Sequence, residues 1–334
     1  MRAMVLESQA PIGAQALRLE TLPKPEPAAG EILVRIAACG LCRTDLHIVE
    51  GELPLARTPI VPGHQAVGRV DGMGPGVTHL RPGDRVGIAW LRRTCGACRH
   101  CESGRENLCE RAEFTGYHAD GGFAEYAVVP AGFAYLLPAV FSDTEAAPLL
   151  CAGIIGYRAL TLTDVGRGGR LGLYGFGSSA HITLQVAVAR DIRVYVVTRS
   201  VAARALARDL GAAWSGDVTE RPPTPTEGAI IFAPAGEIVP LALRNLAPGG
   251  TLALAGIYMS RIPPLNYADL YGERRITSVA NNTRDDGRRL LAEAAAIPVR
   301  PAITPFPLAE ANRALELLKH GGLTGSGVLV TDQD

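Results

Sequence analysis

Apolar and polar positions follow two different patterns along this chain. In the first part, short apolar stretches alternate with turn residues. EILVRIAA (31–38) is typical of a strand, and three further segments are typical of a turn followed by a strand: 62–70, 81–90 and 121–130. Gly and Pro, 38 and 24 of the 334 residues, are denser before about residue 150. We therefore predict a turn-rich β domain at the start.

From about residue 148, apolar strands alternate with helical patterns. The strands are expected at 170–177, 193–200, 229–234, 250–257 and 275–280, and the helices at 182–190, 201–211 and 237–246. Such alternation indicates a parallel sheet with right-handed crossovers. The last fifty residues are mixed again, with helices near 285–296 and 308–320 and a strand at 327–332. We predict an α/β protein in which a domain at 149–281 is inserted into one built from 1–148 and 282–334.

Charge and hydropathy exclude several classes of protein. Lys plus Arg equal Asp plus Glu at 33 each, so no basic field favours nucleic acid or an anionic membrane. The start, MRAMVLESQAPIG, interrupts its apolar run at Glu7 and lacks the core of a signal peptide. No window contains the ~18 uninterrupted apolar residues of a membrane span. We expect a cytoplasmic protein.

Four of the seven cysteines form a cluster with metal-ligand spacing: Cys95, Cys98, Cys101 and Cys109. An odd number of cysteines in a long, reduced chain argues against a disulfide framework. The spacing C-x2-C-x2-C-x7-C lets one short loop surround a tetrahedral ion, and four thiolates make a closed structural zinc site. An iron–sulfur run would place its fourth cysteine three residues on, before Pro, whereas Glu110 follows Cys109 here. The cluster predicts a zinc-held lobe at 93–110.

A glycine loop, G-F-G-S-S-A, follows the strand predicted at 170–177 and opens a helix. This context is typical of dinucleotide binding: Gly175 permits the tight turn, Gly177 lets the backbone approach a pyrophosphate, and Ala180 allows close helix packing. The next strand ends V-V-T-R-S, without the Asp or Glu that usually binds the adenosine ribose of NAD.

We therefore expect Thr198, Arg199 and Ser200 to contact the nucleotide. Without a carboxylate there, the site favours NADP without excluding NAD, because Arg199 could pair with a 2′-phosphate. The alternative for Arg199 is a solvated loop charge.

The segment C-G-L-C-R-T-D-L-H (39–47) is compatible with a redox dithiol, a zinc knuckle or a site that uses only one sulfur. Together with P-G-H-Q-A-V-G, the four-cysteine lobe, P-L-L-C-A-G-I and the glycine loop, in this order, it resembles the zinc-dependent alcohol dehydrogenases of the medium-chain dehydrogenase/reductase superfamily. The resemblance covers nearly the whole chain. It implies a GroES-like β-rich catalytic domain joined to a Rossmann domain with a doubly wound parallel sheet.

The resemblance also implies a second, catalytic zinc ion, held by Cys42, His64 and Cys151 with one open position. Cys39 matches no family role and is expected to be a small buried residue. The alternative for His64 is an ordinary turn histidine.

Further roles are implied by the same resemblance. Thr44 matches the hydroxyl that takes the alcohol proton, His47 the group that passes it on by way of the nicotinamide ribose, and Asp45 the carboxylate that orients the ligand histidine. Helix capping or a surface position is the alternative for Thr44 and His47. Arg43 matches a pyrophosphate contact. Trp90 matches a wall of the substrate pocket, with plain core packing as its alternative.

Three positions depart from the family pattern. Gln65 stands where Glu is usual, Ile155 where many members have Thr against the nicotinamide, and Ser326 where an Arg that contacts the cofactor is common. The resemblance implies a tetramer with two zinc ions per chain that interconverts small primary alcohols and aldehydes with NADP or NAD. The alternatives are a polyol or formaldehyde dehydrogenase of the same fold, and a zinc-free protein similar to quinone reductases.

Overall fold

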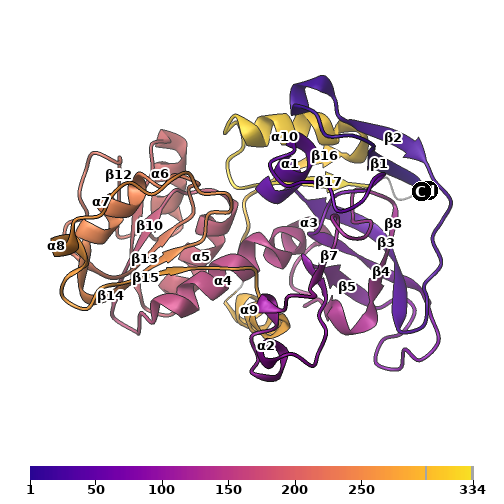
Figure 1. Cartoon of the computed structure of the whole chain (residues 1–334), viewed down its shortest axis with the longest axis horizontal. Helices are drawn as coiled ribbons and strands as arrows, with labels where there is room; N and C mark the ends of the chain where they lie inside the picture. The colour runs from indigo at the N-terminus through magenta and orange to yellow at the C-terminus, as the bar shows by residue number, and fades with distance from the viewer. Residues whose placement is uncertain (298, 332–334) are drawn as a thin grey trace. The chain divides into compact units, whose positions relative to one another are not determined.

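The computed structural model describes residues 1–297 and 299–331. The chain divides into two compact units. Unit 1 contains Met1–Cys151, Asn281–Ala295 and Ala302–Asp334, and unit 2 contains Ala152–Ala280 and Ala296–Pro301. Each unit is built around its own sheet, and both sheets are labelled in Figure 1.

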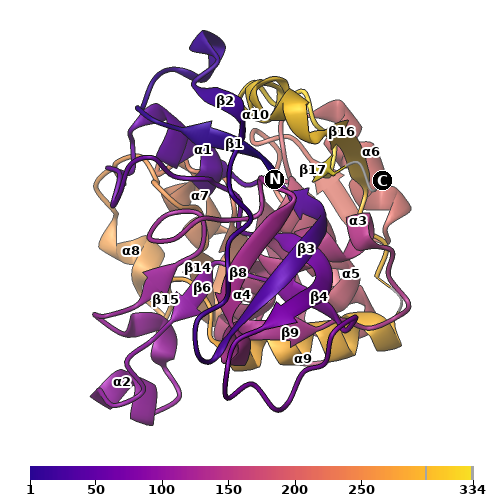
Figure 2. The ribbon, with the colours of Figure 1, turned by 90° about the vertical axis from the view of Figure 1, so that its right-hand side faces the viewer.

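The sheet of unit 1 has seven strands that come from both ends of the chain. Its order is β16 (Ile303–Pro307), β17 (Ser326–Val330), β3 (Glu31–Gly40), β4 (Ala66–Met73), β5 (Arg85–Ile88) and β9 (Ala134–Leu136), and β8 (Tyr126–Pro130) also pairs with β3. Every pairing except β16–β17 is antiparallel. Figure 2 shows β3, β4, β8 and β9 together. Strand β3 is central because it pairs with β17, β4 and β8, and its alternate residues Ile32, Val34 and Ile36 are buried.

Helices and small hairpins cover this sheet. Helix α10 (Ala311–Lys319) buries Ala311, Ala314 and Leu315, three and four residues apart, and lies against α1 (Arg43–Glu50). The other elements of unit 1 are β1 (Arg2–Leu6), η1 (Ile12–Ala14), β2 (Leu17–Thr21), β6 (Leu91–Arg93), α2 (Arg99–Glu102), η2 (Glu106–Leu108), β7 (Glu113–Phe114), η3 (Ala131–Phe133), α3 (Asp143–Ala146), η4 (Ala147–Leu150), α9 (Arg284–Ala296) and η5 (Leu308–Glu310).

The sheet of unit 2 has six parallel strands. Their order is β12 (Trp214–Gly216), β11 (Arg193–Val197), β10 (Arg170–Tyr174), β13 (Thr226–Ile231), β14 (Leu246–Leu254) and β15 (Arg275–Ser278). The third, second and first strands of the unit therefore precede the fourth, fifth and sixth, which is the doubly wound order. The helices are α4 (Ala152–Thr163), α5 (Ser178–Ala189), α6 (Val201–Asp209), α7 (Ile238–Arg244) and α8 (Tyr267–Leu270). The strand order places the switch point between β10 and β13.

The predicted β-rich first part, the alternating middle and the parallel sheet are confirmed. Among the elements that were not predicted are α4, β12 and β16. Strand β16 reads ITPFP, and its two prolines are tolerated because it lies at the edge of the sheet. Helix α4 contains two glycines and is buried on most sides, so it lacks an amphipathic pattern. The last predicted strand ends at Val330, and residue 332 of that prediction lies outside the described residues.

Within residues 1–297 and 299–331, no single helix is long and apolar enough to cross a membrane. Only the pair Asp143–Leu150 and Ala152–Thr163, bent by 45°, meets the criteria of length and composition when its two members are combined.

An ion pair anchors the loop that carries the four cysteines. Glu106 of η2 accepts hydrogen bonds from the Arg284 backbone N–H (2.8 Å), from Nε (3.0 Å) and from Nη2 (2.7 Å). The Arg284 guanidinium also lies 4.3 Å from the centre of the Phe133 ring. Burial alone would raise the pKa of the Glu106 carboxyl, but the hydrogen bonds from Arg284 outweigh it and lower that pKa below its usual value. The charged form of Glu106 therefore stabilises the fold.

Glu106→Gln should lower the free energy of unfolding by about 1–3 kcal/mol at neutral pH, because charged hydrogen bonds are lost. A lowered carboxyl pKa contributes stability above the unfolded-state pKa and loses it as pH falls, so the gap to wild type should narrow below about pH 4.5. Urea titration at several pH values measures this. Glu310→Gln, which breaks an exposed pair with Arg313, is the control and should change little. Equal effects of the two substitutions would contradict the anchoring role.

Candidate active site

Cys42 caps the N-terminus of α1, and this fixes the direction of its sulfur. The backbone of Cys42 is extended (φ −130°, ψ 155°), and Sγ accepts a hydrogen bond from the Thr44 backbone N–H at 3.4 Å. In return, the Cys42 backbone N–H donates to Asp45 Oδ2 at 2.9 Å. This is a capping box in which a thiol stands where Ser or Thr is usual. The first cysteine of the C-x-x-C pair, Cys39, instead lies on β3 and is 1% exposed.

The carboxylate of Asp45 also holds His64. Its Oδ1 accepts hydrogen bonds from the Gly63 backbone N–H at 3.2 Å and from His64 Nδ1 at 3.0 Å, and both side chains are fully buried. Gly63 has φ +97°, and a Cβ there would lie 2.4 Å from the Phe123 ring, so the turn before His64 requires glycine. A histidine that donates from Nδ1 to a carboxylate presents Nε2 to its other side.

Cys151 completes the group. It follows η4, and its Sγ lies 3.9 Å from Cys42 Sγ. The ligand atoms of Cys42, His64 and Cys151 all lie within 4.8 Å of one another. The structure therefore brings together the three residues expected to hold the catalytic metal, although 109 positions separate Cys42 from Cys151.

The chemistry of this donor set fits a zinc ion. His64 Nε2 is buried and has no hydrogen-bond partner within the described residues. A buried polar atom without a partner is costly, so a ligand at Nε2 is expected. Two thiolates at about 2.3 Å from a tetrahedral zinc ion would lie roughly 3.8 Å apart, close to the observed separation of the sulfurs. Three protein ligands also leave one position for a further group.

The protonation of the three side chains supports this fit. The hydrogen bond between the two sulfurs lowers the pKa of the Cys42 thiol well below its usual value and raises that of Cys151 well above it. Burial would lower the pKa of His64, but the neighbouring Asp45 carboxylate and Cys42 thiolate raise it to about 10. Without metal, the group therefore holds protons that a dication would displace.

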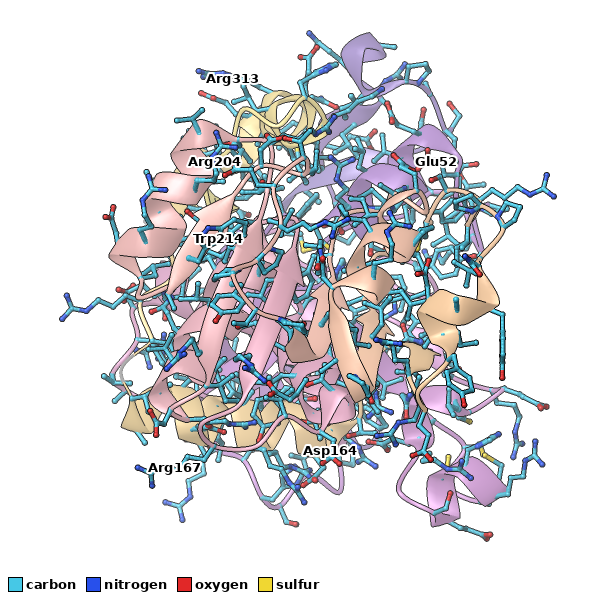
Figure 3. All side chains as sticks on the ribbon, turned by 90° about the vertical axis from the view of Figure 1, so that its left-hand side faces the viewer. Glu52, Asp164, Arg167, Arg204, Trp214 and Arg313 are labelled. Atoms are coloured by element: carbon cyan, nitrogen blue, oxygen red, sulfur yellow. The ribbon has the colours of Figure 1, made fainter. Side chains whose placement is uncertain are left out.

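Thr44, His47 and Arg43 all belong to the first turns of α1. Thr44 is 6% exposed, and its Oγ1 lies 3.6 Å from Cys42 Sγ. His47 is 5% exposed, and its Nδ1 is hydrogen-bonded to Glu52, which follows the helix and is labelled in Figure 3. Arg43 is half-buried. Glu52 was not singled out from the sequence, because a carboxylate in a polar turn carries no local signal of its partner.

Trp90 lies against His64, one of the three candidate metal ligands. The residue is 8% exposed, and its ring meets the His64 ring edge-on, with the centroids 4.8 Å apart. On its face it stacks on Phe114, at 4.8 Å and 10° between planes. The position expected to line a substrate pocket is therefore both part of the core of unit 1 and a neighbour of His64.

The four remaining ligand candidates converge as well. The sulfurs of Cys95, Cys98, Cys101 and Cys109 lie within 4.8 Å of one another, and the Cys95 backbone N–H donates to Cys109 Sγ at 3.4 Å. The Ala97 backbone N–H lowers the pKa of Cys95 to about 6, whereas desolvation raises that of Cys101 to about 11. Four sulfurs held this closely fit a tetrahedral zinc ion, which would offset part of the charge of their thiolates.

The glycine loop of unit 2 lies at the carboxyl end of β10, at the switch point. Gly175 has φ +84°, and a Cβ there would lie 2.9 Å from Ala233 N, so no other residue fits. Gly177 caps α5, and a Cβ there would meet nothing within 4 Å, which leaves room beside the helix N-terminus. Ala180 is fully buried. An open helix N-terminus of this kind fits a pyrophosphate.

The loop after β11 is held by an arginine that the sequence did not reveal. Nη1 of Arg204, which is labelled in Figure 3, donates to the carbonyl oxygens of Thr198 (2.9 Å) and Arg199 (3.3 Å) and pairs with Asp217 at 3.1 Å. Ser200 caps α6, since its Oγ accepts from the Ala203 N–H. The Arg199 side chain is exposed. The loop is thus fixed through its backbone, and a cation projects from it.

The three departures from the family pattern have different surroundings. Gln65 is 1% exposed, and its side chain lies against Gly40. A Cβ added at Gly40 would lie 3.1 Å from Nε2 of Gln65. Ser326 at the start of β17 is 3% exposed, and Ile155 of α4 is half-buried.

Comparisons with known proteins agree with this geometry. The family model of the alcohol dehydrogenase GroES-like domain matches residues 28–139. A probable alcohol dehydrogenase AdhA of Mycobacterium tuberculosis is 49% identical over 99% of this chain and 97% of its own length. An alcohol dehydrogenase of Geobacillus stearothermophilus is 35% identical over 99% and 100%. A cobalt- and zinc-bound thermostable alcohol dehydrogenase from Pyrobaculum aerophilum is similar in structure, with a TM-score of 0.91 and 26% identity over 99% of each chain.

Asp45→Asn should weaken zinc binding at the His64 site by about ten- to a hundredfold, because the ligand histidine loses the carboxylate that orients it. Competition with a chromophoric chelator, with the four-cysteine site as an internal reference, measures the affinity. Asp71→Asn, at an exposed pair with Lys24, is the control. Zinc affinity equal to that of wild type would show that Asp45 does not orient His64.

Proposed function

Because the chain belongs to the zinc-dependent alcohol dehydrogenases of the medium-chain dehydrogenase/reductase superfamily, we propose that it transfers hydride reversibly between a primary alcohol or aldehyde and NAD(P). The observation that carries this proposal is the convergence of Cys42, His64 and Cys151. The buried Nε2 of His64 finds no hydrogen-bond partner among residues 1–297 and 299–331. Two sulfurs and one imidazole make the donor set of a catalytic zinc site that keeps an open position.

These three residues would hold the catalytic zinc. A zinc ion with two thiolate ligands supplies a Lewis acid that binds an alcohol oxygen and lowers its pKa. Asp45 would keep the imidazole in the tautomer that offers Nε2. The presence of all three ligand residues argues against the zinc-free, quinone-reductase-like alternative.

The residues of α1 would move the alcohol proton. The Thr44 hydroxyl would accept it, and His47 would pass it towards solvent, with Nδ1 of the imidazole hydrogen-bonded to Glu52. This role is supported by the position of both side chains on α1, with Thr44 Oγ1 3.6 Å from Cys42 Sγ. Arg43 is assigned to the pyrophosphate, where a guanidinium gives bidentate hydrogen bonds.

Unit 2 would bind the nucleotide. Gly175, Gly177 and Ala180 would cradle its pyrophosphate, and Thr198, Arg199 and Ser200 would meet its adenosine ribose. We propose NADP as the preferred form, because the loop offers a cation and no carboxylate at 198–200. Accordingly, residues 149–281 form the cofactor domain in this proposal, and 1–148 with 282–334 form the catalytic domain.

The remaining parts of the proposal concern composition and assembly. The four-cysteine site would hold a second, structural zinc, so that each chain carries two ions. All seven cysteines are free of disulfide bonds, as expected for the cytoplasmic location that we propose. A homotetramer is proposed from the family resemblance alone. Trp90 beside His64 would narrow the pocket, which favours small primary alcohols over polyols.

Cys42→Ser should lower kcat/KM for primary alcohols by about 1,000-fold or more, since the loss of metal activation removes several kcal/mol of transition-state stabilisation. A steady-state panel of small alcohols, polyols and formaldehyde adducts with both nucleotides measures it, alongside zinc content. Cys39→Ala changes the neighbouring core cysteine and should retain turnover. Full activity of the Cys42 variant would overturn the ligand assignment, and a clear preference for polyols would overturn the substrate class.

Arg199→Asp should lower the ratio of kcat/KM with NADP to that with NAD by about ten- to a hundredfold, because a charged hydrogen bond is replaced by repulsion. Arg193→Asp makes the same charge change at the amino end of β11, the strand that precedes Arg199, and should leave the ratio unchanged. An unaltered ratio in the Arg199 variant would remove this residue from the nucleotide site.

A further inference from the structure

The orientation of Trp90 depends on one hydrogen bond. Its indole Nε1–H donates to Asn281 Oδ1 at 3.1 Å, across 191 positions of sequence. Aromatic rings also surround the indole: Phe114 stacks on its face at 4.8 Å, Tyr117 lies at 6.1 Å, and His64 meets it edge-on. Stacking fixes the plane of an indole but not the direction of its N–H, because a half-turn about the Cβ–Cγ bond restores the same plane. The hydrogen bond to Asn281 selects one of these two orientations.

Asn281 is mounted rigidly. Its backbone is in the left-handed region (φ 52°), which asparagine tolerates better than most residues. The segment that follows is tied down twice. Asp286 accepts hydrogen bonds from both the backbone N–H and the hydroxyl of Thr283, at 2.8 Å each, and Arg284 binds Glu106. The amide oxygen of Asn281 therefore reaches Trp90 from a fixed frame within unit 1.

We infer that Asn281 is a positioning residue that determines substrate selectivity by holding the Trp90 indole against His64. The inference rests on the proposed function, because it treats Trp90 as the wall beside the reacting alcohol. An indole held by its N–H presents one fixed edge to the metal ligand and limits the bulk of a substrate carbon chain. An indole free to rotate would present a variable wall. Longer alcohols would then be admitted and short ones held less closely.

The test separates the loss of the hydrogen-bond acceptor from a change in the backbone conformation at residue 281. Asn281→Gly keeps the left-handed conformation and removes the acceptor, whereas Asn281→Asp keeps both. Asn281→Gly should lower the ratio of kcat/KM for ethanol to that for 1-hexanol by about fivefold, the value of one neutral hydrogen bond. Asn281→Asp should restore most of the ratio. Trp90→Phe removes the N–H, so Asn281→Gly should have no further effect in that background.

A second readout does not depend on activity. The chain has two tryptophans, so Trp214→Phe leaves Trp90 as the sole indole fluorophore. In that background, Asn281→Gly should lower the fluorescence anisotropy of Trp90 and shift its emission, and Asn281→Asp should not. Unchanged anisotropy, or an unchanged selectivity ratio in an active enzyme, would overturn the inference. A wild-type protein that oxidises no alcohol would overturn the proposed function instead, while a lowered anisotropy would still establish the hold of Asn281 on Trp90.

Discussion

The buried carboxylate of Asp45 is the interaction on which the site depends. It accepts hydrogen bonds from the backbone N–H groups of Cys42 and Gly63 and from the imidazole of His64, so it joins the start of α1 to the turn before β4. Burial raises the pKa of this carboxyl, and the contact with His64 opposes that rise. A buried charge persists only with such partners. The same contacts that satisfy Asp45 therefore aim one sulfur and one nitrogen at a common point.

The two cysteine groups of unit 1 differ in the number of candidate ligands and in their spacing along the chain. These two differences favour a structural role for the four-cysteine group and a chemical role for the other. Cys95 to Cys109 lie within one short loop, and four sulfurs leave no position for a further group. That loop is attached to α9 through Glu106 and Arg284, so its effect is on the fold. Cys42, His64 and Cys151 come instead from the start of a helix, a turn and the end of η4. Their convergence therefore depends on the packing of unit 1.

Hydrogen-bond partners outside the motifs hold several candidate site residues, from five positions away for His47 and Arg199 and from 191 positions away for Trp90. Glu52 holds His47, Arg204 holds the carbonyl groups around Arg199, and Asn281 holds Trp90. None of these partners belongs to a motif. Each acts on a residue that does, by fixing its orientation through a hydrogen bond, and orientation is what distinguishes a ligand or a pocket wall from a side chain that merely lies nearby.

Local pattern was enough to determine the β-rich first part, the βαβ alternation, the glycine loop and the four-cysteine cluster, because each depends on contacts between residues close in sequence. It could not reveal β16, whose prolines are allowed only by its edge position, or α4, whose burial on most sides removes the helical pattern. Nor could C-x-x-C spacing tell that Cys39 enters the core while Cys42 caps a helix. The tertiary structure decided these points, since burial, edge positions and long-range hydrogen bonds exist only once distant segments pack together.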